Sequence, residues 1–135
     1  MLKTYRRGGN VFVALNKSYR MYVPISDYLS VYRGHKPDIA LSTPTRVLLD
    51  TLISRRCILG LITDGWSVTQ RNKIAALGLE QYVSSDNMLI SEEFGSEKPC
   101  PDNYHHFELK YLGRQFCYIE DNLQKDFAAP NKLGW

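Results

Sequence analysis

The chain has 135 residues, of which 44% are hydrophobic and 23% charged, and its formal net charge is +3. These proportions are ordinary for a soluble globular protein with one hydrophobic core. No apolar run approaches the roughly 18 to 20 residues of a membrane-spanning helix, since the longest, Cys57–Ile62, has only the length of a buried strand. The charged segment from Met1 to Arg7 precedes no apolar stretch, so it is not a secretory signal. We therefore predict a cytoplasmic protein that does not enter a membrane.

The charges and the cysteines argue against two further classes. Lys and Arg are interspersed with acidic residues along the chain, which argues against a nucleic-acid-binding protein. The three cysteines, Cys57, Cys100 and Cys117, are odd in number and share no CxxC spacing. Neither a disulfide framework nor a zinc site is therefore expected, and we predict three reduced, structural thiols.

The first 40 residues differ from the rest of the chain, because they are rich in aromatic side chains and show no alternation of strands and helices. Pro24 predicts a break between two helices in this region. The apolar run Val11–Leu15 is ambiguous, because its pattern fits either a helix or a strand.

Helices and strands alternate from about residue 42 onward. A helix is predicted to begin at Thr43, which supplies a hydroxyl cap before a proline at the first helical position. The continuous apolar run Cys57–Ile62 is typical of a strand buried on both faces of a parallel sheet. The next helix is expected to begin at Ser67, which has capping-box spacing with Gln70, and to end at Gly78 in a left-handed conformation.

The second half of the chain repeats this alternation. A short strand is expected at Met88–Ile90, a helix from Asp102 to Gly113, and a last clear strand at Phe116–Ile119. The tail is predicted to be a short helix or turn interrupted by Pro130. Elements that alternate at this spacing indicate parallel strands joined by right-handed crossovers, so the predicted fold class is α/β.

The three residues that directly follow the first predicted strand could bind phosphate. In an open parallel sheet, ligands bind beyond the carboxyl ends of the strands. Thr63 directly follows Cys57–Ile62, and its hydroxyl, together with the backbone N–H groups of Asp64 and Gly65, would form a nest for a phosphate oxygen. The alternative is a plain strand end followed by a turn.

Two further regions suit the same chemistry. Asp121 follows the strand Phe116–Ile119 and has Glu120 and Asp126 near it, and carboxylates at a strand end suit Mg²⁺. Lys98 lies in an irregular loop, where it would neutralise a phosphoryl group as a point charge. The alternatives are a helix cap with solvated acidic residues and a solvated loop lysine.

Three segments, taken in order, resemble the second, third and fourth motifs of the haloacid dehalogenase superfamily. They are Leu61-Ile62-Thr63-Asp64-Gly65, Glu97-Lys98-Pro99-Cys100-Pro101, and Tyr118-Ile119-Glu120-Asp121-Asn122 followed by Asp126. The segment from Arg71 to Leu79 is similar to the helix that follows the second motif. Tyr32 to Ile39 resembles the return from a helical cap to the core, and the whole resemblance covers about residues 8–135.

The resemblance implies a fold and an activity. The fold would be an incomplete Rossmann-like α/β fold with three layers, in which residues 1–40 form a partial helical cap. Residues 41–135 would form the core, without the family's first and last strands. The implied activity is Mg²⁺-dependent hydrolysis of a small phosphorylated metabolite, in which an aspartate attacks phosphorus and forms an aspartyl-phosphate.

The resemblance also assigns roles to the residues that match its motifs. Thr63 and Lys98 would be catalytic. Asp121 would ligate Mg²⁺, and Asp126 would support the metal through water or orient its neighbours. The implied phosphate-binding residues are Thr63, Asp64, Gly65 and Lys98.

Two departures from the family pattern bear on activity. The family's first motif is an apolar strand that ends in Asp-x-Asp, and no two aspartates of this chain are separated by one residue. Its nearest mimic, Val11–Leu15 followed by Asn16 and Ser18, lacks both carboxylates, and we favour a cap helix there. Glu120 stands where the family often has glycine, and it would crowd the site or add charge to it.

A truncated member without the nucleophile motif is expected to begin inside the cap and to be inactive by the family mechanism. The alternatives are a non-catalytic module that binds phosphate, Mg²⁺ or a partner protein, and a shortened product without independent function. Without the central strand, the strands at Leu59 and Cys117 would pair directly, or Val11–Leu15 would fill the gap. In the remaining alternative the sheet is exposed, and copies of the chain could associate through it.

Overall fold

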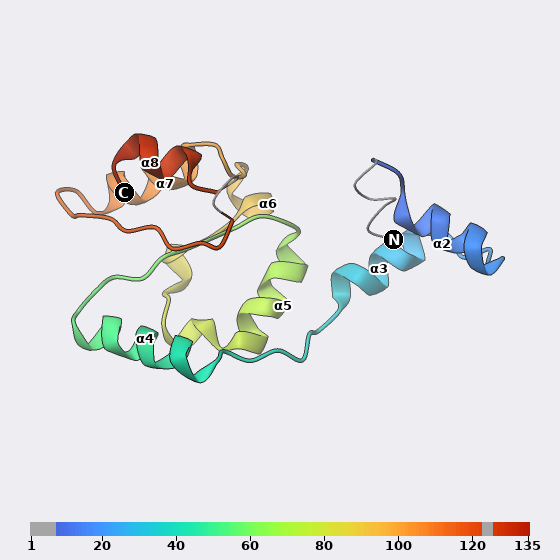
Figure 1. Ribbon diagram of the computed structural model, residues 1–135, viewed down its shortest axis with the longest axis horizontal. Coiled ribbons are helices and arrows are strands. Elements are labelled where there is room, and N and C mark those ends of the chain that lie inside the picture. Colours follow the sequence, from blue (N-terminus) through green and yellow to red (C-terminus); the bar gives the residue numbers. More distant parts are fainter. Residues whose placement is uncertain (1–7, 123–125) are drawn as a thin grey trace. The chain divides into compact units, whose positions relative to one another are not determined.

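The structure is a computed structural model that describes residues 8–122 and 126–135. The chain divides into two compact units, residues 1–35 and residues 36–135 (Figure 1). The roles predicted for these regions, a partial cap in residues 1–40 and a core in residues 41–135, stay predictions.

The first unit contains two helices, α2 (Val11–Tyr19) and α3 (Ile25–Gly34). The side chain of Asn10 caps α2 by accepting hydrogen bonds from two backbone N–H groups of its first turn, at 2.9 and 3.2 Å. The run Val11–Leu15 is therefore helical, as we favoured, and does not form a substitute strand. Pro24 lies at the N-cap of α3, which confirms the predicted break between two helices.

Side chains of α2 and α3 hold the two helices together. The rings of Phe12 and Tyr28 stack with their centroids 5.2 Å apart. The Tyr28 hydroxyl donates to Asn16 Oδ1 at 2.7 Å, and Asn16 Nδ2 donates to the Val23 carbonyl at 2.7 Å. Asn16, which stands near the place of a carboxylate in the missing motif, therefore has a structural role here.

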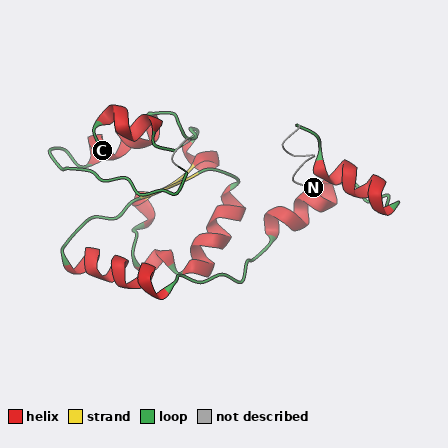
Figure 2. Ribbon diagram, viewed as in Figure 1, coloured by secondary structure: helices red, strands yellow, loops and turns green. Residues whose placement is uncertain are grey.

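The second unit is a mixed α/β structure with a small parallel sheet (Figure 2). Strands β1 (Leu61–Thr63) and β2 (Met88–Ile90) pair in parallel, with Leu61 opposite Met88 and Thr63 opposite Ile90. In Figure 1, α4 and α5 lie on one side of these strands, and α7 and α8 lie on the other. The predicted class, an incomplete Rossmann-like α/β fold, is confirmed. The elements in chain order are α4 (Thr43–Ser54), β1 (Leu61–Thr63), α5 (Ser67–Leu77), the 3-10 turns η1 (Leu79–Gln81) and η2 (Ser85–Asn87), β2 (Met88–Ile90), α6 (Ser91–Phe94), α7 (Asp102–Lys110) and α8 (Ala128–Leu133).

The hydrophobic core of this unit surrounds β2. Ile90 is completely buried, and Met88 packs with Ile74 of α5 and with Val83. Leu59, Leu61, Leu79 and Tyr82 cover this cluster from the outside. Full burial of such a side chain stabilises the fold by roughly 1.5 to 3 kcal/mol. None of the helices in the described part of the chain is long and apolar enough to cross a membrane.

Aromatic rings hold the C-terminal tail against α7. Tyr104 and Phe107 are buried on one face of this helix. The ring of Trp135 meets Tyr104 edge to face, with the centroids 5.2 Å apart, and stacks on Phe116 at 4.5 Å. Its indole N–H donates to Glu108 Oε1 at 2.9 Å, so the last residue of the chain is fixed by packing and by a hydrogen bond.

Two predicted strands differ from the structure. The strand predicted at Cys57–Ile62 is regular only over Leu61–Thr63, and Phe116–Ile119 forms no regular strand. A strand needs a neighbour to accept and donate its backbone hydrogen bonds. Within residues 8–122 and 126–135, β1 pairs with β2 alone, and residues 115–121 make no backbone hydrogen bond to another strand. The two segments also leave the thiols of Cys57 and Cys117 exposed, so the prediction that both are structural thiols within buried strands is wrong.

Helix ends follow the predicted signals with small shifts. Ser42, one residue before the predicted cap, accepts the capping hydrogen bond of α4. The N-cap of α7 is Pro101, and Asp102 makes no capping bond. Gly78 ends α5 with a φ of 64°, the left-handed conformation predicted for it. Pro130 does not interrupt the tail helix as we predicted, because it lies in the first turn of α8, where its missing N–H is tolerated.

Asn87 is a buried amide that joins three segments, and its replacement should be costly. Its Nδ2 donates to the Leu59 carbonyl at 3.2 Å, and its Oδ1 accepts from Lys110 Nζ at 2.9 Å and from the Tyr111 hydroxyl at 2.7 Å. Asn87→Ala leaves these groups without their partner, so we expect the free energy of unfolding to fall by about 1 to 3 kcal/mol. Denaturant titration followed by circular dichroism measures this loss. Exposed Asn131→Ala is the control, and equal losses in both variants would contradict the prediction.

Candidate functional site

The turn after β1 is braced by residues of α5 and α6. The Thr63 hydroxyl donates to Gln70 Oε1 at 3.0 Å, and Gln70 Nε2 donates to the Asp64 carbonyl at 3.0 Å. The backbone N–H of Gly65 donates to Ser91 Oγ at 2.9 Å. Gly65 has a φ of 131°, and a Cβ atom there would come within 2.7 Å of Gln70 Nε2, so the turn requires glycine. Two of the predicted phosphate donors therefore have internal acceptors.

The beginning of α5 is stabilised by carboxylates from a distant segment. We expected Ser67 and Gln70 to form a capping box, but this is wrong, because no side chain of α5 caps it. The Ser67 N–H donates to Glu92 Oε2 at 2.6 Å. The Glu93 carboxylate accepts hydrogen bonds from the Ser67 hydroxyl and from two nitrogens of Arg71. Arg71 Nε lies 2.7 Å from Oε1, and Arg71 Nη2 lies 2.5 Å from Oε2. The hydrogen bonds from Arg71 and Ser67 lower the pKa of Glu93, and negative charge at a helix N-terminus is favourable.

Lys98 lies at the centre of a group of carboxylates, which we call the Lys98 cluster and define as Lys98, Asp64, Glu120 and Asp126. The Lys98 backbone N–H donates to Asp64 Oδ1 at 3.0 Å. Its Nζ lies 3.2 Å from Asp126 Oδ1 and 3.5 Å from Glu120 Oε1. The side chains of Lys98 and Asp126 are 8% and 5% exposed, so solvent screens this ion pair little.

The Lys98 cluster keeps its lysine charged and carries an excess of negative charge. Burial by itself would lower the pKa of Lys98, but the hydrogen bond with Asp126 and the charges of Glu120, Asp126 and Asp64 raise it overall. One ammonium group faces three carboxylates, so the cluster is net negative at neutral pH. An anion can enter such a cluster only together with a cation that compensates its charge.

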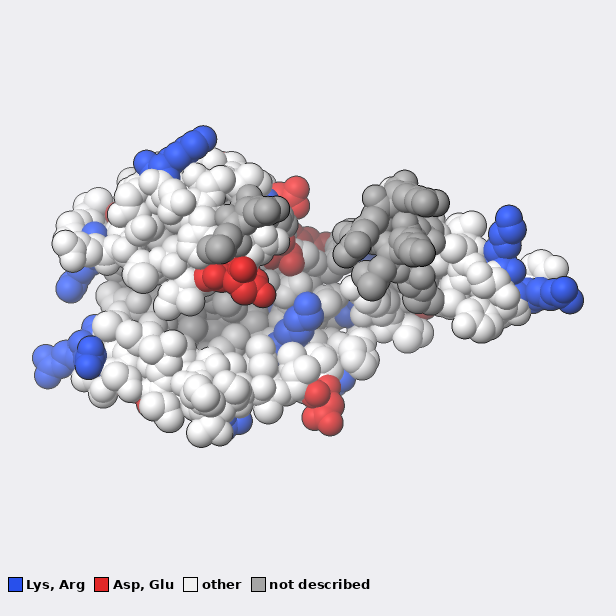
Figure 3. All heavy atoms as spheres, in the orientation of Figure 1, with Lys and Arg blue, Asp and Glu red and all other residues white. Residues whose placement is uncertain are grey.

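The structure brings together some of the predicted site residues and not others. Asp64, Lys98 and Asp126 meet in the Lys98 cluster, whereas Asp121 is exposed. Glu120 adds charge, one of the two effects predicted for it, by pairing with Lys98. In the described ranges 8–122 and 126–135, no group of three or more His, Cys, Asp or Glu side chains forms a metal site. On the face drawn in Figure 3, the basic side chains of residues 36–135 are spread out rather than gathered in one patch.

Sequence reasoning missed the residues that brace the site. Gln70 and Ser91 hold the turn after β1, but their spacing carries no signal, because the contacts join separate elements. Tyr104 and Tyr118 back the cluster, and their rings meet edge to face with the centroids 5.4 Å apart. The Tyr104 hydroxyl donates to the Asp126 carbonyl at 3.4 Å.

The two tyrosines predict a loss of stability at alkaline pH. Burial, together with the negative charges of Glu120 and Asp126, raises the pKa of Tyr118 to about 12, and burial also raises the pKa of Tyr104. An unfolded tyrosine loses its proton near pH 10. Since the folded state holds these protons more tightly, the stabilisation is complete below pH 10 and is lost as the pH rises toward 12.

The alkaline loss is measured by denaturant titrations at several pH values between 8 and 12. We expect Tyr118→Phe to flatten the decline, because phenylalanine cannot ionise. Tyr22→Phe, which changes a side chain that is 96% exposed, should leave the decline unchanged. The same slope in wild type and in Tyr118→Phe would contradict the prediction.

Comparisons with known proteins agree on one family. The sequence model of the haloacid dehalogenase-like hydrolases matches residues 7–135. A relative from Methanocaldococcus jannaschii, named glyceraldehyde 3-phosphate phosphatase, is 31% identical over 106 residues, which are 74% of this chain and 45% of the relative. A relative of the same name from Methanopyrus kandleri is 31% identical over 111 residues, which are 78% of this chain and 46% of the relative. The chain therefore spans about half the length of the curated relatives it matches. No solved structure matches the chain significantly.

Proposed function

The chain belongs to the haloacid dehalogenase-like hydrolases, and we propose that it carries the phosphate-holding and Mg²⁺-holding part of a phosphohydrolase site at the carboxyl end of β1. The observation that carries this proposal is the Lys98 cluster, a buried lysine among three carboxylates at a strand end. The name of the two relatives supports a phosphate monoester as substrate. It also makes glyceraldehyde 3-phosphate the first small phosphorylated metabolite to test.

The phosphate-binding role rests on three donors. The Lys98 ammonium group, which stays charged because its pKa is raised, would neutralise the phosphoryl oxygens as a point charge. The Thr63 hydroxyl and the Gly65 N–H would exchange their present acceptors, Gln70 and Ser91, for phosphate oxygens. The exchange keeps one hydrogen bond for each donor, so its cost is small.

The negative charge of the Lys98 cluster is the physical argument for a metal. A phosphate dianion would add charge to a group that is already net negative, and a divalent cation would compensate both. Mg²⁺ takes oxygen ligands, commonly one or two carboxylates with water and substrate phosphate, and the donors here are carboxylates. Exposed Asp121 would ligate it directly, and Asp126, whose Oδ1 is paired with Lys98 Nζ at 3.2 Å, would act through water. When bound, the metal would supply neutralisation of the charge on the phosphoryl group.

We also propose that these 135 residues do not hydrolyse phosphate esters by themselves. No two of the chain's aspartates have the Asp-x-Asp spacing of the family's nucleophile and acid. Asn16, in the nearest mimic of that motif, lies in a helix and hydrogen-bonds to Tyr28 and Val23. An amide attacks phosphorus far less readily than a carboxylate does.

Thermal unfolding with Mg²⁺, with inorganic phosphate, and with both tests the binding part of the proposal. We expect phosphate to raise the melting temperature by several degrees only when Mg²⁺ is present, because a ligand of the folded state at 100 times its Kd adds about 2.7 kcal/mol. Asp121→Asn should remove the shift, and Asp50→Asn, an exposed carboxylate of α4, should keep it. A phosphate shift that is independent of Mg²⁺, or no shift in folded protein, would contradict the proposal.

Turnover of glyceraldehyde 3-phosphate and of an aryl phosphate, each with Mg²⁺, tests the second part. We expect no release of phosphate above the rate of Asp121→Asn. Turnover that is present in wild type and lost in Asp121→Asn would show that the chain contains a nucleophile, and the proposed inactivity would be wrong. The binding result would stand in that case.

A further inference from the structure

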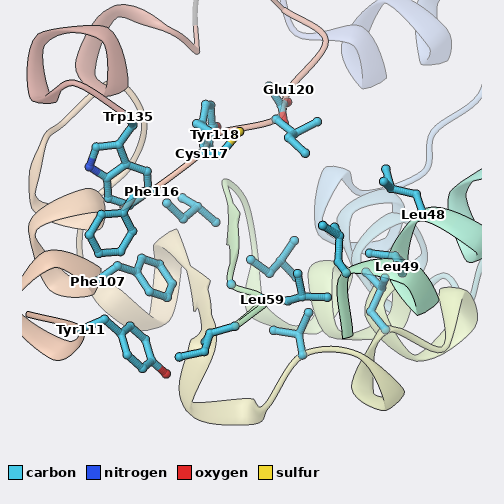
Figure 4. Close-up of a pocket in the computed structure, with 18 of the residues that line it drawn as sticks. Leu48, Leu49, Leu59, Phe107, Tyr111, Phe116, Cys117, Tyr118, Glu120 and Trp135 are labelled. Carbon is cyan, nitrogen blue, oxygen red and sulfur yellow. The ribbon is translucent and has the colours of Figure 1, made fainter. Parts of the chain in front are cut away.

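An apolar groove of about 420 Å³ runs beside β1 in the second unit. One wall is the segment Leu59–Ile62, and the other is the segment Phe116–Glu120 (Figure 4). Leu48, Leu49 and Leu52 of α4 also line it. Most of the lining is hydrophobic, and Ile119 on the second wall is 70% exposed.

Both walls of the groove present backbone groups that have no strand partner. In the described part of the chain, β1 pairs with β2 along one edge only. Phe116–Glu120, where the sequence predicts a strand, makes no backbone hydrogen bond to another strand among residues 8–122 and 126–135. Two segments that line one apolar groove and keep unpaired backbone groups offer a place for an added strand.

Side chains hold the two walls together at both ends of the groove, and they show that the walls run in the same direction. At the carboxyl end, Lys98 contacts both Asp64, which follows β1, and Glu120, which ends the second wall. At the amino end, a Cβ atom on Gly60 would come within 2.8 Å of the Phe107 ring. Trp135 connects that ring to the second wall, because its ring centroid lies 6.5 Å from that of Phe107 and its ring stacks on Phe116.

We propose that this groove binds an extended, apolar segment of another polypeptide chain as a strand parallel to β1. A peptide fits better than a small apolar ligand, because only a strand satisfies the backbone N–H and C=O groups of both walls. About five residues would fill it, since a strand advances about 3.3 Å per residue. This inference does not depend on phosphate or metal binding.

The charges at the two ends define the flanks of the peptide. Arg114 lines the groove just before Phe116, so an acidic residue fits before the apolar stretch. At the other end the Lys98 cluster is net negative, so a basic residue fits after it. The occupant is therefore a run of β-branched residues with an acidic residue at its amino end and a basic residue at its carboxyl end.

Fluorescence anisotropy with a labelled synthetic peptide tests the proposal on the full chain. The probe has about five alternating valine and isoleucine residues, preceded by glutamate and followed by lysine. We expect saturable binding, at least about tenfold weaker binding when the central residue is proline, because proline donates no hydrogen bond to the sheet, and weaker binding when the end charges are exchanged. Equal binding of the proline peptide would mean simple apolar adsorption and would overturn the proposal.

A pair of matched variants places the binding in the groove. Ile119→Arg puts a charge on the second wall and should abolish binding, whereas Leu112→Arg changes a side chain that is 79% exposed and does not line the groove. Hydrogen exchange in wild type should slow at the amides of residues 116–120 when the peptide is bound. This readout does not depend on whether Ile119→Arg folds.

Three further results would overturn the proposal. Folded wild type without saturable binding would do so, and so would bound peptide without slower exchange at residues 116–120. A concentration-dependent dimer that buries the groove and excludes the peptide would assign the groove to a second copy of this chain.

Discussion

Lys98→Met is expected to lower the free energy of unfolding by about 3 to 5 kcal/mol, the usual cost of removing one partner from a buried ion pair. The substitution keeps most of the side-chain volume but leaves Asp64, Glu120 and Asp126 facing one another without a cation. Asp126 suffers most, because its side chain is only 5% exposed. Denaturant titration at pH 7 measures the loss, and Lys132→Met, at an exposed lysine of α8, should change the stability by less than about 0.5 kcal/mol.

A double variant separates the lost ion pair from a packing defect. Adding Asp126→Asn to Lys98→Met removes the buried charge that the single variant leaves unpaired, so we expect part of the stability to return. A loss below about 1 kcal/mol in Lys98→Met, or no recovery in the double variant, would mean that solvent screens the Lys98 cluster.

Tyr104→Ala is expected to cost about 3 to 5 kcal/mol, because it removes a large aromatic side chain from the core. Tyr104 is completely buried and meets the rings of Tyr118 and Trp135 edge to face. The cavity would separate the tail from α7, since Trp135 packs on Tyr104. Thermal or denaturant unfolding measures the loss.

Tyr104→Phe is the matched variant for this prediction. It keeps the ring and removes only a hydroxyl group whose hydrogen bond to the Asp126 carbonyl is long, at 3.4 Å. We expect a loss of about 1 kcal/mol or less, the usual net contribution of one hydrogen bond. Similar losses in the two variants would show that the hydroxyl, and not the ring, stabilises this part of the core.

Local signals in the sequence were sufficient to predict most of the longer helices and the family. Pro24 separates α2 from α3, and Gly78 ends α5 in the left-handed conformation predicted for it. Both residues act through the conformations of their own backbone, which neighbours along the chain determine. The motif segments around Thr63, Lys98 and Asp121 led to the family that the comparisons support. Such segments can be recognised without knowledge of their contacts.

Only the tertiary structure decided which strands form and which side chains meet. Met88–Ile90 became a strand because β1 lies beside it, whereas Phe116–Ile119, with an equally good pattern, has no strand partner in the described part of the chain. Glu92 and Glu93 replaced the expected capping box of α5, and Glu120 joined Lys98. All of these contacts join residues far apart in the sequence, because hydrogen bonds and ion pairs depend on distance in space. The sequence by itself therefore determined most of the longer helices, the chain order of the motifs and the family, while the fold decided the short helix α6, the extent of the sheet and the charge of the site.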